Sequence, residues 1–275
     1  MINKLGRKHW TDEKLITRVI HNITNHAYWE NIHELRMRPS DLLFNRCLQL
    51  ISSQNEKEKR VGIDILAQLG SPNRPYLSQT LEIYFNLLNS ETDELILSQI
   101  LFGIGHNNEN LTAKQIEKIC AIYQIGSSLV YEGLIFALGF IDTSKTIDIL
   151  IQLSTDQKAH NRDWATFFLA ESKRNNKKIR QALWNRIDDK NKNVRLESIM
   201  GLAKRKDSRV IEVIKTQIHD IDYPIGIFQA ILDLKDPQFL PLLEKNLEQV
   251  ALGEVHYMAW LEDLKWCITE LSRLQ

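Results

Sequence analysis

The clearest candidate for chemistry in this chain is Asp163, which is directly followed by Trp164. A carboxylate beside an aromatic ring could act as a catalytic base next to a surface on which a planar substrate stacks. Such a site also needs a geometry that spacing in a sequence does not supply. Both residues fit a structural pattern as well, described below, and we favour that structural interpretation.

Histidine forms no recognisable metal site in the sequence. Three of the eight histidines, His21, His26 and His33, crowd the N-terminal segment, but no pair has the Glu-flanked i, i+4 spacing of a helical zinc site. The sequence also has no Gly-rich phosphate loop, no nucleophile elbow and no Cys-x-x-Cys motif. We therefore predict that the protein is not an enzyme and has no catalytic residues, metal or cofactor.

Composition restricts the class of protein. Only 11 Gly and 6 Pro occur in 275 residues, which argues against an all-β fold with its frequent turns. Lys plus Arg and Asp plus Glu number 35 each, so the basic excess of a general nucleic-acid binder is missing. Cys47, Cys120 and Cys267 are widely separated, which favours buried thiols in a reducing compartment. With no apolar run of about 18 residues and no signal-peptide core near Met1, we expect a cytoplasmic protein that does not enter membranes.

The elements that would position any such residue follow a repeat. From Arg162 and again from Arg195, an Arg is followed three positions later by a small residue and seven positions later by Leu. Counting back from each recurring Leu-like position gives a set of anchors 29 to 37 residues apart, as in arrays of stacked helical hairpins. These anchors are Lys59, Glu94, Tyr131, Arg162, Arg195 and Pro224. Where the residue three positions on is small, as at Gly62, neighbouring helices can approach closely.

A first helix is expected before each of these second helices, because apolar residues recur there at three- and four-residue spacing. Thr112, Ser144 and Ser208 stand where N-caps belong. The expected first helices cover residues 41–52, 76–89, 113–124, 144–154, 178–187 and 209–219, and a last pair covers 238–250 and 254–274. Residues 11–38 are also predicted to be helical, but they do not match the repeat. We expect a helical N-terminal cap at 1–39 and one continuous repeat domain at 40–275.

The stretches from Asp163 to Phe167 and from Val194 to Val210 resemble the short bacterial HEAT-like repeats first described in phycobilisome lyases. The likeness is strong over residues 143–245, weaker back to residue 40, and lost before that. The resemblance implies an all-α, right-handed α-α superhelix of the HEAT-like or ARM type, with about seven helical hairpins. The size and order of the units are similar to immunity proteins of Rhs-type and contact-dependent polymorphic toxin systems, which bind and neutralise a cognate toxin domain.

The same family offers two alternatives. HEAT-like DNA glycosylases that act on alkylated bases use a pair such as Asp163 and Trp164, and other members are chromophore lyases. HEAT-type arrays also commonly bond an Asp of one unit to the Arg of the next. This predicts that Asp163 pairs with Arg195, which is the structural interpretation we favour.

Charge is unevenly distributed along the chain. Residues 173–209 hold 13 basic and 4 acidic side chains, a net charge of +9, whereas residues 77–132 and 211–275 carry −5 and −6. These charges could be solvated loops and outer helix faces, or the basic zone could meet an acidic protein or a phosphate backbone. Acidic flanks would repel a long nucleic acid, so a protein partner fits better.

The preferred hypothesis is therefore a non-enzymatic protein-binding scaffold, and we expect an immunity protein whose partner is a cognate toxin domain. The ridge of second helices would form the binding surface, on which aromatic anchors usually dominate the energy. The candidate partner-binding residues are Tyr131, Glu132, Trp164, Phe167, Arg195, Glu197 and Met200.

Overall fold

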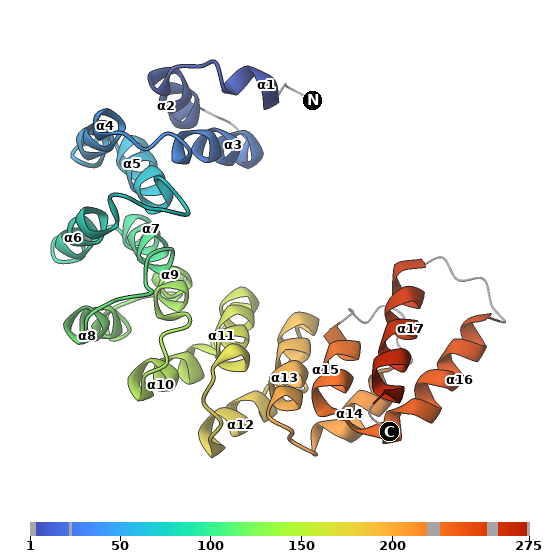
Figure 1. The fold of residues 1–275 in the computed structure, drawn as a ribbon. Coiled ribbons are helices and arrows are strands. Elements are labelled where there is room, and N and C mark those ends of the chain that lie inside the picture. Colours follow the sequence, from blue (N-terminus) through green and yellow to red (C-terminus); the bar gives the residue numbers. More distant parts are fainter. Residues whose placement is uncertain (1–3, 22–23, 219–225, 252–257, 274–275) are drawn as a thin grey trace. The chain divides into compact units, whose positions relative to one another are not determined.

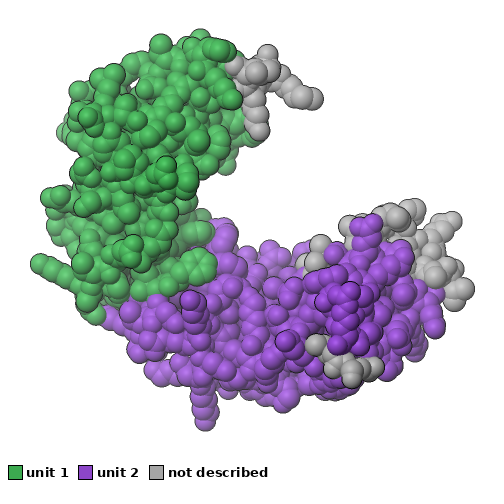
Figure 2. Space-filling model, viewed as in Figure 1, with its two compact units in different colours: residues 1–141 green, residues 142–275 purple. Residues whose placement is uncertain are grey.

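A computed structural model describes residues 4–21, 24–218, 226–251 and 258–273 of the chain (Figure 1). Every regular element within these ranges is a helix, which confirms the predicted all-α helical-repeat fold. The chain divides into two compact units, residues 1–141 and residues 142–275 (Figure 2). The predicted boundary at residue 39 and the single domain from 40 to 275 stay predictions.

Unit 1 is a stack of helical hairpins. The second helices α5, α7 and α9 pack against one another in chain order, and each packs against the helix that precedes it. α2 and α3 pack on each other and on α5, so the predicted helical N-terminal segment is confirmed as helical. The helices are α1 (Lys4–Arg7), α2 (Asp12–His21), α3 (Asn25–Arg36), α4 (Asp41–Ile51), α5 (Glu56–Gln68), α6 (Leu77–Leu87), α7 (Glu94–Gly105), α8 (Ala113–Ile122) and α9 (Ser128–Leu138).

Unit 2 repeats this arrangement. α11, α13, α15 and α17 follow one another as a row of neighbouring helices (Figure 1). Its helices are α10 (Ser144–Leu153), α11 (Ala159–Glu171), α12 (Lys177–Trp184), α13 (Lys192–Lys204), α14 (Val210–Gln217), α15 (Gly226–Leu234), the 3-10 turn η1 (Pro237–Phe239), α16 (Leu240–Ala251) and α17 (Met258–Ser272). All six expected first helices are present within a few residues of their predicted ends, whereas the anchor Pro224 lies outside the described residues.

Side-chain caps explain most helix starts, with two corrections. Thr112 caps α8 through a reciprocal capping box with Gln115, as predicted. α10 is capped by Thr143 and not by Ser144, because Thr143 makes the same kind of box with its own N3 residue. α14 begins after Arg209 and has no side-chain cap, so Ser208 is not an N-cap. Each error is a shift of one residue, within the ordinary uncertainty of helix ends.

Small residues let neighbouring helices approach at backbone distance, both within a hairpin, as α5 does on α4, and between second helices, as α9 does on α7. A Cβ atom added to Gly62 would lie 2.8 Å from the carbonyl oxygen of Cys47, and one added to Gly133 would lie 2.2 Å from the carbonyl oxygen of Ser98. The predicted close approach is therefore confirmed at Gly62. On α9 the contact falls at Gly133, one position earlier than the repeat predicts. Helices packed on both sides are buried nearly all round, as shown by α5, whose residues from Val61 to Ala67 are all buried.

Candidate binding surfaces

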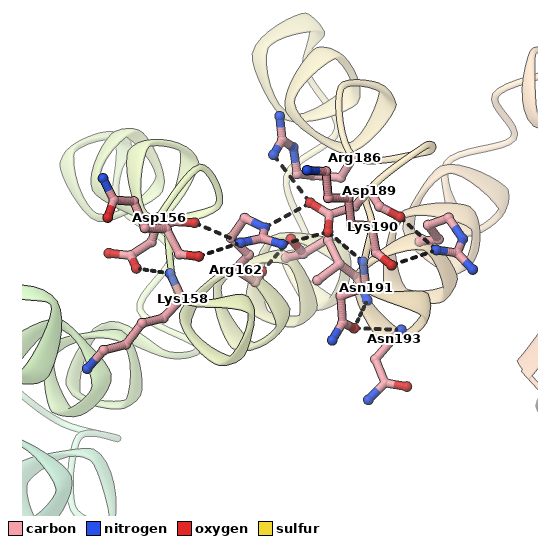
Figure 3. A network of polar contacts seen from close by, with 12 residues as sticks. Asp156, Lys158, Arg162, Arg186, Asp189, Lys190, Asn191 and Asn193 are labelled. Carbon is pink, nitrogen blue, oxygen red and sulfur yellow. Dashed lines mark hydrogen bonds and ion pairs between the residues drawn. The ribbon is translucent and has the colours of Figure 1, made fainter.

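An arginine–aspartate bridge joins two successive hairpins of unit 2 (Figure 3). Arg162, on α11, donates from Nε to Oδ2 and from Nη2 to Oδ1 of Asp189, both at 2.8 Å. Its Nη1 donates to the carbonyl oxygens of Asp156 at 2.9 Å and of Gln157 at 3.0 Å. Burial alone would raise the pKa of Asp189, but the hydrogen bonds from Arg162 and from the Asn191 N–H outweigh it and lower the pKa.

The predicted pair of Asp163 with Arg195 is wrong. Arg195 donates from Nη1 to the carbonyl oxygens of Asp189 and Lys190, which repeats the loop contacts of the first arginine 33 residues earlier. Asp163 instead accepts a side-chain hydrogen bond from Asn193. The reason is angular. Asp163 follows the bridging arginine by one position, so its side chain projects about 100° around the helix from it.

Four of the predicted partner-binding residues lie together on α11 and α13. Trp164 and Phe167 are half-buried, and their rings meet edge to face with centroids 5.6 Å apart. Glu197 and Met200 are half-buried on α13, the neighbouring helix. We call Asp163, Trp164, Phe167, Glu197 and Met200 the ridge of unit 2. Arg195 is half-buried on the same helix, but its guanidinium is engaged by loop carbonyls.

The ridge of unit 2 carries carboxyl groups in an unfavourable electrostatic position. Burial raises the pKa of Glu197 to about 7, with Asp163 and Glu171 adding to the effect and Lys204 opposing it. Burial likewise raises the pKa of Asp163. Lys204 is itself paired with Glu171. The ridge therefore combines aromatic surface with carboxylates that a cation supplied from outside would stabilise.

Most of the basic zone serves the fold. Eight of its thirteen cations hold carboxylates or carbonyl groups within unit 2; these are Arg174, Lys178, Arg180, Arg186, Arg195, Lys204, Arg205 and Arg209. Arg205 is buried and donates to carbonyl oxygens at the ends of α11 and α13, including those of Ala170 at 2.9 Å and Gly201 at 2.8 Å. This favours the structural interpretation of the charge count over a surface built for a phosphate backbone.

In unit 1 the two predicted residues take different positions. Tyr131 turns toward the end of α8, where its hydroxyl donates to the carbonyl oxygen of Tyr123 at 3.1 Å. Its ring also lies against the ring of Tyr123, with centroids 5.5 Å apart. Glu132 instead lines a groove between the second helices. The structure therefore does not bring Tyr131 and Glu132 to one surface.

This groove of unit 1 is formed by side chains from α2, α3, α5, α7 and α9 and has a volume of about 660 Å³. That is within the range of sites that bind small molecules or anchoring side chains. Its floor carries Asp64, which is 8% exposed, and its lining includes Tyr28, Trp29 and Gln99. These residues were not singled out from the sequence. Tyr28 and Trp29 lie in the segment predicted as an N-terminal cap, and Asp64 lies within the apolar pattern of a predicted helix.

Asp64 is held by neutral donors. The hydroxyl of Tyr28 donates to its Oδ2 at 2.5 Å, and Gln99 contributes a further side-chain hydrogen bond. Burial raises the pKa of Asp64, partly offset by these bonds and by the charge of Arg60. Burial and the nearby carboxyl raise the pKa of Tyr28 well above its ordinary value, so the phenol stays protonated as a donor. No residue in the described ranges forms an ion pair with Asp64.

Aromatic rings form the walls of the groove. Trp29 is 42% exposed at its rim and meets Tyr28 edge to face, with centroids 5.2 Å apart. Phe102 and Phe136, from α7 and α9, contact each other with centroids 4.8 Å apart. His106 also lines the groove, and burial together with nearby arginines lowers its pKa, which keeps the imidazole neutral near pH 7.

Comparison with known proteins identifies similar chains but no shared activity. The chain is 35% identical over 129 residues to Protein YibA of Escherichia coli, in strains K12 and O157:H7, which covers 47% of this chain and 46% of the relative. The chain thus spans about half the length of the curated relatives it matches. No family model matches it.

Solved structures extend the likeness to the fold. The crystal structure of YibA from Escherichia coli superposes with a TM-score of 0.71 at 24% identity, over 98% of this chain and 94% of that one. An engineered protein superposes with a TM-score of 0.53 at 12% identity, over 94% of this chain and 78% of that one. Within the described residues no helix is long and apolar enough to cross a bilayer. The chain is therefore an all-α helical-repeat protein that shares the fold of YibA.

Proposed function

We propose that the protein is a non-enzymatic scaffold of the HEAT-like repeat family that works as an immunity protein, binding and neutralising a cognate polymorphic toxin domain. The observation that carries this proposal is the ridge of unit 2, where aromatic and sulfur-containing side chains stay half-exposed beside the buried faces of α11 and α13. Similarity to YibA supports the repeat family. The link to a toxin rests on the resemblance of the repeat sequence.

Half-buried aromatic side chains on a rigid helix favour tight binding of another protein. The Trp164 ring is already fixed by Phe167 and Phe168, so little side-chain entropy would be lost when a partner covers it. Tryptophan is among the residues that most often dominate interface energies. The cytosol is the proposed place of action, and the buried thiols of the described cysteines agree with a reducing compartment.

The test is co-expression with the toxin domain encoded beside this gene, scored by cell survival and by complex formation in high salt. We expect protection, and we expect Trp164→Ala to weaken binding by about 30-fold or more, the effect of a typical hot spot. Trp266→Ala is the matched control, because Trp266 is 45% exposed on α17 and lies outside the ridge. Full toxicity in the presence of the folded protein, with no stoichiometric complex, would contradict the proposal.

A further inference from the structure

The groove of unit 1 has a buried carboxylate with no cation of its own. Asp64 is 8% exposed, lines the groove, and forms no ion pair with any residue in the described part of the chain. Its hydrogen-bond donors, Tyr28 and Gln99, are neutral. A buried carboxylate is unfavourable unless a positive charge compensates it, and such groups cluster at binding sites.

Arg60 also lines the groove, and its charge acts on Asp64, but it does not form an ion pair with that carboxylate. Its Nε donates to Oε1 of Gln99 at 2.8 Å, the Gln99 amide returns a bond to the Arg60 carbonyl oxygen at 3.2 Å, and the arginine side chain stays exposed. Gln99 therefore holds the guanidinium at the rim. Asp64 lines the groove and accepts hydrogen bonds from Tyr28 and Gln99. Because a carboxylate can accept about four hydrogen bonds, it can also accept from a guanidinium that enters the groove.

The walls of the groove also suit a flat cation. Trp29 exposes part of its ring at the rim, and Phe102 and Phe136 stand on α7 and α9. Aromatic faces attract cations, and a guanidinium stacks on them while it donates in-plane hydrogen bonds to a carboxylate. Glu132 adds a second carboxylate to the lining. A lysine would use only the charge, whereas an arginine would use the charge, the rings and the carboxylate together.

We propose that this groove receives an arginine side chain of the partner protein, with its guanidinium on Asp64 and its plane against the aromatic walls. The inference rests on the proposed function, because it names the chemistry that a bound partner presents to unit 1. Lys57 and Arg60 at the rim would weaken the binding of a lone cation without abolishing it. The arginine is therefore expected next to an acidic residue of the partner, which these two side chains would attract.

The test uses the full chain and two small probes, N-acetyl-arginine methylamide and its citrulline analogue, which has nearly the same shape but no charge. The indole N–H resonance of Trp29, assigned with the Trp29→Phe variant, reports binding at the rim in an NMR titration. We expect the arginine probe to bind weakly and at least about 5-fold tighter than the citrulline probe. Lys57→Gln should strengthen arginine binding, because a like charge is removed.

Asp64→Asn should abolish the preference for arginine, whereas Asp41→Asn, a matched change at an aspartate on α4 that also accepts from a tyrosine hydroxyl but does not line the groove, should leave it intact. Should Asp64→Asn fail to fold by circular dichroism, Glu132→Gln takes its place and should reduce the preference. Equal binding of the two probes, or a preference that survives in folded Asp64→Asn, would overturn the assignment.

The two proposals fail separately. If the arginine probe binds through Asp64 but the neighbouring toxin is not neutralised, the groove assignment holds and the toxin pairing is wrong. If the toxin is neutralised while the probes do not distinguish wild type from Asp64→Asn, only the groove assignment is wrong.

Discussion

Removing the charge of Glu197 should stabilise the protein at alkaline pH. The folded structure raises the pKa of this carboxyl from 4.5 to about 7, first through burial and then through Asp163 and Glu171. A group whose acid form is favoured in the folded state binds more protons folded than unfolded, so the free energy of unfolding falls as pH rises from about 4.5 to about 7. Below about pH 4.5, Glu197 is mostly protonated in both the folded and the unfolded state, so it does not lower the free energy of unfolding.

The shift from 4.5 to about 7 corresponds to at most about 3.4 kcal/mol. Glu197 is only partly buried, so solvent screening reduces the expected penalty to about 1–2 kcal/mol. Glu197→Gln should therefore raise the free energy of unfolding by this amount at pH 8 and leave it nearly unchanged at pH 4.5. Urea unfolding at both values measures the difference, because the midpoint shifts without a change in slope.

The matched control is Glu244→Gln, an exposed carboxylate on α16, which should change stability by less than about 0.5 kcal/mol at either pH. The reasoning would be refuted if Glu197→Gln destabilised the protein at pH 8, or if its effect were the same at both pH values. The first result would mean that the carboxylate makes a favourable contact. The second would mean that its effect is steric and not electrostatic.

Three further predictions follow from the packing. Gly133→Ala should lower the free energy of unfolding by about 3 kcal/mol or more in a urea titration, because its Cβ would overlap the backbone of α7. The control Gly226→Ala should cost far less, because its Cβ would meet only the movable ends of two side chains, the sulfur of Met200 and the methyl carbons of Leu196. Arg162→Ala should cost about 2–4 kcal/mol because it removes the two short hydrogen bonds to the buried Asp189 carboxylate and leaves it the longer ion pair with Arg186. Lys178→Ala, from an exposed ion pair, should cost less than about 1 kcal/mol in the same assay. Asp207 has its pKa lowered to about 2, chiefly by hydrogen bonds from arginine, so Asp207→Asn should cost about 1–2 kcal/mol at pH 7, and that difference should shrink as pH falls from 4 toward 2.

The repeat could be predicted from the sequence because it depends on interactions between residues that are close together in the chain. Helix periodicity, caps and a constant spacing all act within one or two hairpins, so the ranges expected for α4, α6, α8, α10, α12 and α14 were close to those observed. Even the close helix approach at Gly62 could be expected, since only a small residue permits it. The half-buried positions of Trp164 and Phe167 follow from the same spacing.

Side-chain contacts between hairpins could not be predicted from the sequence in the same way. Arg195 does not bind Asp163, the aspartate of the repeated motif. The aspartate that joins two hairpins is Asp189 in the loop before α13, which Arg162 binds. The rise and rotation of the helices decide which atoms meet. The net charge of residues 173–209 indicated a surface zone, yet most of its cations bind carbonyl groups and carboxylates of neighbouring hairpins. A charge count does not reveal which side chains are already paired.

By itself the sequence determined the all-α repeat, the approximate bounds of its helices and the row of side chains on α11 and α13, since each depends on residues close together in the chain. Only the tertiary structure decided that Tyr28, Asp64 and Gln99 meet at the floor of a groove. They come from three successive hairpins and are 36 and 35 residues apart, which matches the spacing of the repeat, but that spacing does not reveal that a phenol, a carboxyl group and an amide meet there. Stacking places them together, and burial there, not residue type alone, makes the carboxylate of Asp64 a group in need of a cation.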